Sequence, residues 1–292
     1  MAGRHPQPRH PAVLGRLSQD RVPADNSQHY QGEAARWYSA FYAWKTDDIP
    51  FYQFQAERWA GPGGSVLELA CGNGRVTLPM ARAGHRVTAI DSSEAMIGDL
   101  QRRLQSEPDE VRDRVEPLRQ DMRRFQLDRL FRFIYLPFNT LLLLAQAHER
   151  QAMLDRVREH LAPSGAFALE IFTPDPAALV DADDWVVDLE VEADDPGGEG
   201  RVHVVREMIR SMDLGRQLIH LRFRNRVSRG ETTVATWEDQ LDLAFIFPRE
   251  LELILERQGF RIRDRFGSAD GSAYAPTSGN IQPQFVVAQL IA

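Results

Sequence analysis

The feature that most constrains the fold is a regular alternation of short apolar strands and amphipathic helices between residues 66 and 172. Strands are predicted at Val66–Ala70, Arg86–Ile90, Arg114–Arg119, Phe131–Leu136 and Ala166–Phe172. Helices are predicted at Arg75–Ala83, Ser93–Gln105 and Ala147–Leu161, with Ser93 as an N-cap. Strands that are joined by helices run parallel, so the pattern predicts an α/β fold with a parallel sheet and helices on both faces.

The end of the chain departs from this alternation. Pro248 takes the first position of a helix that is predicted to end at Gln258. Two strands follow, at Phe260–Phe266 and Gln284–Ile291, joined by a loop rich in glycine and serine at residues 267–279. This loop is too short to hold a crossover helix, so the last two strands should pair antiparallel.

Residues 181–244 read as an inserted antiparallel sheet. Strands are predicted at Trp185–Val191, Arg201–Met212, Gln217–Val227 and Thr232–Leu243. Residues 181–199 hold nine acids and no basic residue, whereas residues 201–229 hold eight arginines and two acids. Opposite charges on facing strands stabilise a sheet by about 0.2–1 kcal/mol per pair. We therefore expect these blocks to pair across the sheet, with substrate binding as the alternative interpretation.

The N-terminal region divides into two parts. Residues 1–29 are rich in proline and arginine, lack a secretory signal and are predicted to form a flexible tail. Residues 30–60 are dense in aromatic residues, and Trp37, Phe41 and Trp44 recur at helical spacing before a second helix that runs to Ala60. Two compatible interpretations remain open: the helices pack their aromatic faces on a core, or they form a lid whose tyrosines reach a ligand.

Composition excludes several classes of protein. The 292 residues are 43% hydrophobic and 26% charged, which is ordinary for a soluble globular protein. The single cysteine, Cys71, excludes an intramolecular disulfide and a multi-cysteine zinc site. A formal net charge of −7 argues against general binding to nucleic acid. No apolar stretch approaches the roughly 20 residues that span a bilayer, so we expect a cytoplasmic protein without a membrane partner.

The most informative motif is the glycine loop between the first strand and the first helix, where residues 70–75 read Ala-Cys-Gly-Asn-Gly-Arg. Asp91 stands at the tip of the adjacent strand, where a carboxylate can accept two hydrogen bonds from a ribose. Thr77 stands where the dinucleotide fingerprint requires a third glycine. Glu68 suits an ammonium group better than a pyrophosphate. The motif therefore indicates a ligand that contains adenosine, and favours S-adenosylmethionine over NAD.

The segments Glu68–Gly74 and Ala89–Ser93, together with Met96, resemble motifs I and II of the class I S-adenosylmethionine-dependent methyltransferases. The family usually has glycine at the position of Ala70. The resemblance implies a Rossmann-like, seven-stranded, mostly parallel sheet with helices on both faces, an antiparallel last strand and an inserted antiparallel sheet. It implies a cofactor-binding domain at residues 61–180 and 245–292, a helical lid at 30–60, and an insertion at 181–244 that covers the site or forms a homodimer contact.

The resemblance also implies roles for residues at matched positions. Those assigned to S-adenosylmethionine are Glu68, Ala70, Gly72, Gly74, Asp91, Ser92, Met96, Asp121, Met122 and Leu136. Glu68 would orient the ammonium group, and Asp91 would hold the ribose hydroxyls. The adenine would be bordered by residues 92 and 96 and bound by residues 121 and 122.

The second substrate is less constrained. Candidates to bind it are Tyr38, Tyr42, Asn139 and Trp237, and candidates for catalysis are His148, Glu170 and Tyr38. The segment Phe131–Asn139 resembles motif IV of the family. Arg132 stands where family members often have an aspartate, so one candidate metal ligand is missing, which argues against a metal-dependent enzyme. The sequence around Asn139 also lacks the motif used to methylate amide or base nitrogens. We expect N- or O-methylation of a small molecule, with a bacterial secondary metabolite as one candidate. An RNA or protein methyltransferase and a non-catalytic S-adenosylmethionine-binding regulatory protein remain alternatives.

Overall fold

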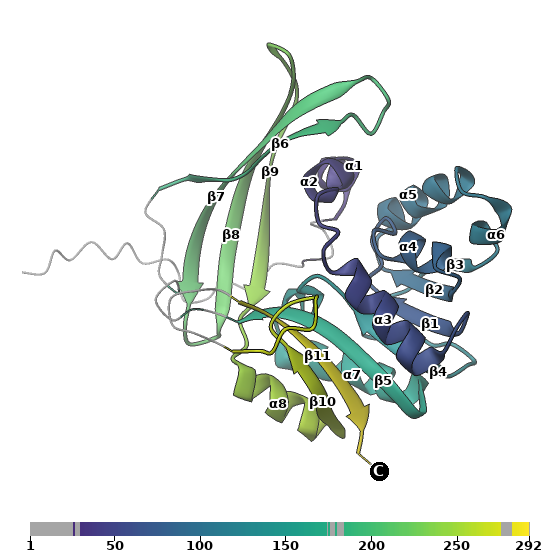
Figure 1. Cartoon of the computed structure of the whole chain (residues 1–292). Coiled ribbons are helices and arrows are strands. Elements are labelled where there is room, and N and C mark those ends of the chain that lie inside the picture. Colours follow the sequence, from purple (N-terminus) through teal and green to yellow (C-terminus); the bar gives the residue numbers. More distant parts are fainter. Residues whose placement is uncertain are drawn as a thin grey trace, which may run out of the picture.

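The structure, a computed structural model, describes residues 26, 30–173, 175, 179, 184–275 and 282–291. Within these ranges the chain forms a seven-stranded sheet and a separate four-stranded sheet (Figure 1). No helix in the described ranges combines the length and the apolar character that a membrane crossing requires.

The larger sheet has the strand order β10-β11-β5-β4-β1-β2-β3. Its strands are β1 (Ser65–Leu69), β2 (Arg86–Asp91), β3 (Val115–Arg119), β4 (Phe131–Leu136), β5 (Leu161–Thr173), β10 (Phe260–Phe266) and β11 (Gln282–Leu290). Strands β1 to β5 pair in parallel, whereas β11 pairs antiparallel with both β5 and β10. The predicted mostly parallel sheet with an antiparallel last strand is confirmed.

Helices cover both faces of this sheet, as predicted. They are α3 (Ile49–Ala60), α4 (Thr77–Arg82), α5 (Glu94–Gln105), α6 (Asp109–Arg112), η2 (Thr140–Leu143), α7 (Ala147–His160) and α8 (Pro248–Arg257). Alternate side chains of a strand point to opposite faces. Leu67 and Ile134 are therefore buried with α7 and α8, while their neighbours Val66 and Phe133 are buried with α3, α4 and α5. The Ser93 hydroxyl accepts the Met96 amide at 3.2 Å, which confirms the predicted N-cap of α5.

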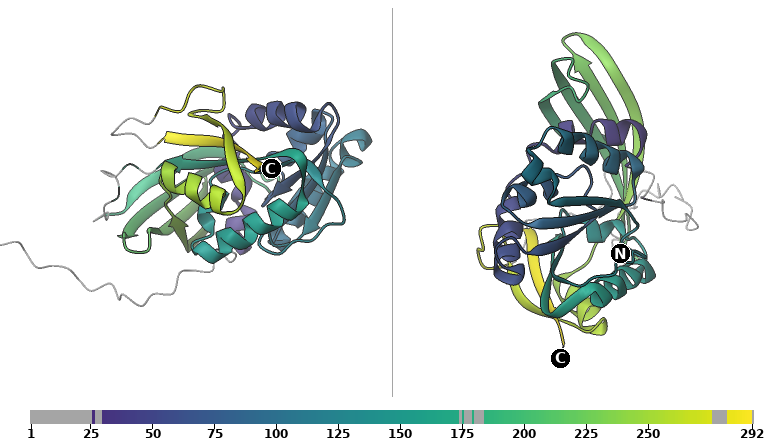
Figure 2. Two further views of the ribbon diagram at one scale, coloured as in Figure 1. Left: turned by 90° about the horizontal axis from the view of Figure 1, so that it is seen from below. Right: turned by 90° about the vertical axis from the view of Figure 1, so that its right-hand side faces the viewer.

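The inserted sheet is an antiparallel meander in the order β6-β7-β8-β9, and Figure 2 shows it extending from the α/β domain. Its strands are β6 (Val186–Asp194), β7 (Arg201–Asp213), β8 (Leu218–Arg229) and β9 (Thr232–Ala244). The expected pairing of the charge blocks is confirmed by ion pairs that join Arg206 to Asp188, Arg201 to Asp194 and Arg229 to Asp195.

Two short helices, α1 (Gly32–Arg36) and α2 (Tyr38–Tyr42), lie between the inserted sheet and the α/β domain (Figure 1). Trp37 and Phe41 are buried with Val204 and Val227 of the sheet. The predicted aromatic stripe was wrong at Trp44, which is 58% exposed. The reason is local, because α2 ends at Tyr42 and the chain then turns, so residue 44 no longer follows helical spacing.

Asn26 belongs to the stretch that was predicted to be a flexible tail, yet it is tied to distant parts of the chain. Its side-chain amide donates to the carbonyls of Leu143 and Asp242, both at 2.7 Å, and its side-chain oxygen accepts the Asp242 amide at 3.1 Å. The remainder of residues 1–29 lies outside the described residues, so the prediction for it stays a prediction.

Candidate functional site

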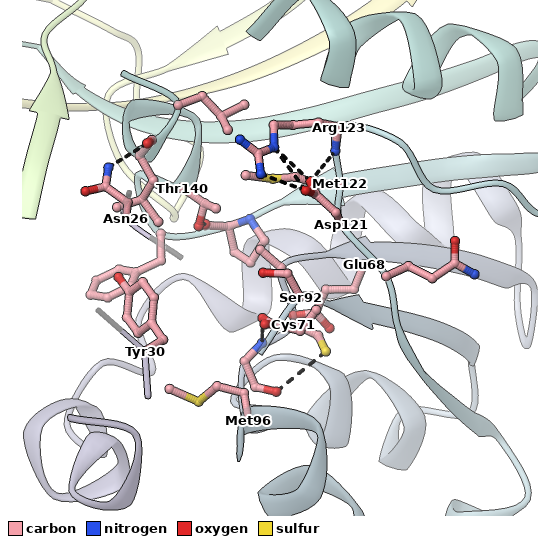
Figure 3. A pocket seen from close by; sticks show the side chains of 18 of the residues that line it. Asn26, Tyr30, Glu68, Cys71, Ser92, Met96, Asp121, Met122, Arg123 and Thr140 are labelled. Carbon is pink, nitrogen blue, oxygen red and sulfur yellow. Dashed lines mark hydrogen bonds and ion pairs between the residues drawn. The ribbon is translucent and has the colours of Figure 1, made fainter. Parts of the chain in front are cut away.

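A cavity of about 310 Å³ lies at the carboxyl ends of β1, β2 and β4. Its walls come from the loops that follow β1, β2, β3 and β4, and Tyr30 lies at another side (Figure 3). Tyr38 also lines the cavity. In open α/β sheets, ligands bind in the crevice at the carboxyl ends of the strands. The volume falls in the range of roughly 300–1,000 Å³ that is typical of small-molecule pockets.

The glycine loop forms the floor of the cavity. Ala70, Gly72 and Gly74 all have a positive φ, at 52°, 55° and 86° respectively. At Gly72 an added Cβ would meet only the Tyr38 ring, at 4.0 Å, so the backbone is open to a ligand on that side. Ala70 holds a conformation that glycine adopts more readily, at a cost of about 1 kcal/mol.

Gly74 has a structural role beneath the cavity and does not line it. A Cβ at this position would lie 2.4 Å from the Leu100 Cδ1 atom of α5. The missing side chain therefore lets the loop pack closely on that helix.

Asp91 fastens the glycine loop to the end of β2. Its Oδ2 atom accepts the Gly72 amide and its Oδ1 atom accepts the Ser93 amide, both at 2.8 Å. Burial raises the pKa of Asp91, and the backbone hydrogen bonds from Ser93 and Gly72 oppose that rise. Its carboxylate lines the cavity beside Ser92.

Glu68 presents a buried carboxylate at the cavity wall, with 1% of its surface exposed. The Thr77 hydroxyl donates to its Oε2 atom at 2.6 Å, and the Tyr135 hydroxyl donates to the same atom at 3.0 Å. Burial raises the pKa of Glu68 to about 7. Thr77, which breaks the dinucleotide fingerprint, thus serves to orient this acid.

Asp121, Met122 and Met96 also line the cavity. Arg123 donates to Asp121 through its backbone amide at 2.8 Å and its Nη2 atom at 2.7 Å, and it also forms an ion pair with Glu149 at 2.5 Å (Figure 3). Burial opposes ionisation of Asp121, but the hydrogen bonds from Arg123 hold its pKa below the ordinary value. Asp121 is therefore a charged acid at the cavity wall, and Arg123 lies beside it.

The turn after β4 contacts α2 at the edge of the cavity. Phe138 and Asn139 are consecutive residues in the left-handed region, with φ of 61° and 57°. Phe138 lines the cavity, lies edge-on to Tyr42 at 5.2 Å and packs 5.1 Å from the Arg75 guanidinium. Strain in two adjacent residues costs of order 1–3 kcal/mol each and persists only where the surroundings impose it.

The predicted substrate residues fall into two groups. Tyr38 lines the cavity, and Tyr42 stacks on it with the ring centroids 4.8 Å apart. The backbone amide of Asn139 donates to the Glu170 backbone carbonyl at 3.1 Å, while its buried Oδ1 atom has no hydrogen-bond partner among the described residues. Trp237 packs on Phe41 away from the cavity. The predicted cofactor residue Leu136 is fully buried in β4 and its side chain does not line the cavity.

The three catalytic candidates have different surroundings. Tyr38 is the one that lines the cavity, and burial raises its pKa well above the ordinary value. Glu170 is 4% exposed, lies 3.6 Å from the Nζ atom of Lys45, and has its pKa raised by burial to about 7. His148 is exposed in the first turn of α7 and does not line the cavity.

Sequence reasoning missed Arg75, which lines the cavity and binds the fully buried Asp48 through two hydrogen bonds of 2.6 and 2.7 Å. A basic residue directly after a glycine loop was the available signal. It also missed Asn26, which lines the cavity from the stretch predicted to be a tail. Tyr30, the first residue of the aromatic segment, lines the cavity as well.

Comparison with known proteins gives consistent matches. The family described as "Methyltransferase domain" matches residues 66–165. A cypemycin N-terminal methyltransferase from Streptomyces sp is 27% identical over 216 residues, which cover 74% of this chain and 80% of the relative.

Solved structures extend the likeness over the inserted sheet. The CcbJ methyltransferase from Streptomyces caelestis has a TM-score of 0.70 at 21% identity and covers 92% of this chain and 96% of its own, which shows the same fold. The glycopeptide N-methyltransferase MtfA in complex with S-adenosyl-L-homocysteine has a TM-score of 0.56 at 26% identity and covers 84% of this chain and 88% of its own.

Proposed function

The chain belongs to the class I S-adenosylmethionine-dependent methyltransferases, and we propose that it transfers the methyl group to an amine nitrogen of a small molecule. S-adenosylmethionine is the cofactor, and S-adenosylhomocysteine is the product that remains after transfer. The names of two relatives support an amine acceptor, because one is an N-terminal methyltransferase and the other a glycopeptide N-methyltransferase.

The cavity residues fit this cofactor along its length. In the proposed complex, Glu68 faces the ammonium group and Asp91 the ribose hydroxyls. The Arg75 guanidinium also lines the cavity and suits the carboxylate of the methionine part of the cofactor. Ala70 and Gly72 offer main-chain groups.

The remaining assignments concern the adenine and the frame of the site. In the proposed complex, the adenine is bordered by Ser92, Met96, Asp121 and Met122. Gly74 shapes the glycine loop, and the Leu136 carbonyl shapes the end of the cavity where the methyl group is transferred.

The lining of the cavity supports an amine acceptor, because the candidate base found there is a tyrosine, Tyr38. This candidate base lines the cavity, and its raised pKa keeps the phenol neutral and unable to accept a proton. A hydroxyl acceptor must lose its proton early, whereas a neutral amine attacks with its own lone pair. The position of Tyr38 at the cavity is therefore the observation that carries the proposal, together with the names of the two relatives.

When bound, the cofactor supplies a methyl carbon on a sulfonium sulfur, which is an excellent leaving group. The acceptor nitrogen forms the new C–N bond while the C–S bond breaks and leaves its electron pair on sulfur; the product amine releases its proton to solvent. In this scheme Tyr38, Tyr42 and Phe138 exclude water and hold the nitrogen about 3–3.5 Å from the methyl carbon. Residues 30–60 act as the lid, and the inserted sheet of residues 181–244 supports it.

Incubation of the full chain with S-adenosylmethionine tests the proposal. The acceptors are a short peptide with a free N-terminal amine, a nucleotide-linked amino sugar, and the analogue of each in which a hydroxyl replaces the amine. Mass spectrometry should show S-adenosylhomocysteine and a methylated product with one amine and with neither hydroxyl analogue. Transfer to the hydroxyl analogues, or to RNA or an intact protein instead of the small amines, contradicts the proposal. Cofactor binding without transfer to any acceptor favours the non-catalytic alternative.

A further inference from the structure

Arg206 of β7 joins the inserted sheet to the lid helix α2. Its Nη1 atom donates to the Tyr42 hydroxyl at 2.9 Å, and its Nε and Nη2 atoms reach Asp188 at 2.7 and 2.5 Å. The guanidinium lies 5.2 Å from the Phe41 ring centroid and 4.9 Å from that of Phe223. Its side chain is 15% exposed, so a charge sits within a largely apolar face of the sheet.

This placement determines where the guanidinium can find partners. A buried charge is costly unless it is paired and hydrogen-bonded, and Arg206 satisfies this requirement through Asp188 on one side and Tyr42 on the other. If α2 moved away from the sheet, the guanidinium would lose the hydroxyl and both of the aromatic rings that α2 supplies. The sheet therefore favours one position of the lid.

Tyr42 connects this contact to the cavity. Its ring packs on Tyr38 at 4.8 Å and on Phe138 at 5.2 Å. Tyr38 in turn reaches the glycine loop, where its ring lies 4.0 Å from the place a Gly72 Cβ would take. A contiguous series of packed groups thus runs from Arg206 to the cofactor loop.

We propose that Arg206 is a positioning residue, which fixes Tyr42 and through it Tyr38 against the glycine loop, so that the inserted sheet sets the closed lid over the cofactor. Arg206 does not line the cavity, and it acts through the two tyrosines. The proposal rests on the proposed function only in that the cavity holds the cofactor, and its test therefore uses cofactor binding and not methyl transfer.

The test is calorimetric titration of the full chain with S-adenosylhomocysteine. Arg206→Met should weaken the affinity about tenfold, the equivalent of one charge-assisted hydrogen bond. Tyr42→Phe should weaken it by a smaller factor. The double variant should bind about as weakly as Arg206→Met alone, because the two groups act through one contact.

Arg224→Met is the matched control. Arg224 also lies in the inserted sheet, pairs with Glu238 at 3.2 Å and packs on the Trp185 ring at 4.0 Å, and both of these partners lie outside α2. Its replacement should leave the affinity unchanged. Arg206→Lys keeps the charge, but a single amine cannot hold Asp188 and Tyr42 together, so an intermediate affinity is expected.

Hydrogen exchange provides a second measurement that does not depend on the affinity. In Arg206→Met bound to S-adenosylhomocysteine, the amides of residues 38–42 should exchange faster, and those of β1 should not. Wild-type affinity and wild-type exchange in Arg206→Met, or effects of the two single variants that multiply in the double variant, would overturn the proposal. Absence of S-adenosylhomocysteine binding by the wild-type chain would instead count against the cofactor site itself.

Discussion

The carboxylate of Asp91 accepts the amide hydrogen of Gly72 at 2.8 Å, so the acid at the end of β2 and the glycine loop after β1 are joined directly. The same carboxylate holds the Ser93 amide with its other oxygen. The glycine loop and the end of β2, which both line the cavity, therefore position one another.

Replacement of Asp91 should weaken ligand binding in a chain that still folds. We expect Asp91→Asn to weaken S-adenosylhomocysteine binding about 100-fold, because hydrogen bonds to a charged group contribute roughly 1.5–3 kcal/mol each. Calorimetric titration measures the loss. Asp155→Asn is the control, since Asp155 pairs with Arg158 on the surface of α7 at 3.2 Å. Equal affinities of the two variants would contradict the role of Asp91.

The glycine loop gives a prediction about stability. Gly74→Ala would place a Cβ 2.4 Å from Leu100 Cδ1 at a φ of 86°, and should lower the free energy of unfolding by about 2–4 kcal/mol. Gly98→Ala lies within α5 with no atom within 4 Å of its new Cβ, and should raise that free energy by about 0.5–1 kcal/mol. Urea unfolding of both variants checks the opposite signs.

Glu68 predicts a pH dependence of stability. Its pKa rises from 4.5 to about 7 in the folded chain, so between these values the folded state binds a proton that the unfolded state has lost. The free energy of unfolding should therefore fall as pH rises through this window, by up to about 1.4 kcal/mol per pH unit for this group, and level off above it. Glu68→Gln should make the decline shallower in urea unfolding measured between about pH 5 and pH 8.

Glu170 must be separated from Glu68 in this experiment, because burial also raises its pKa to about 7. Glu170→Gln should remove its own share of the decline, and the double variant should remove most of it. A decline that persists unchanged in the double variant would show that other groups cause it.

The junction between α2 and the inserted sheet gives the last prediction. Phe41 is buried against Trp237, with the ring centroids 5.8 Å apart, and Phe41→Ala should cost about 3–5 kcal/mol. Trp44→Ala, at an exposed position, should cost less than about 1 kcal/mol. Thermal unfolding distinguishes the two; a Trp44 variant as unstable as the Phe41 variant would mean that the aromatic stripe of the sequence does pack as a whole.

Local sequence was sufficient where one short segment contains the whole signal. Neighbouring residues contain the strand period, the helix spacing and the Ser93 cap, and the structure confirms the elements that these patterns predict. The spacing of Trp37, Phe41 and Trp44 misled because it assumed that one helix continues, whereas α2 ends at Tyr42. Periodicity reports which face a helix would present, but it does not report where tertiary packing ends that helix.

Residues that act through distant partners could be identified only in part. Glu170 stood out as an acid in an apolar strand, but its neighbour Lys45 comes from the lid segment. Asn26 gave no signal, because its partner Asp242 lies in the inserted sheet. Neither pair has a spacing that recurs along the chain, so no local pattern could have indicated it.

By itself, the sequence determined the order of the elements and the parallel sheet. It also predicted the cofactor end of the site, because the glycine loop and Asp91 follow directly from adjacent strands. Only the tertiary structure decided which side chains of residues 30–60 line the cavity and which of them contact the inserted sheet. The contact between Arg206 and Tyr42 joins residues 164 positions apart, and the folded packing of two separate elements brings their side chains together.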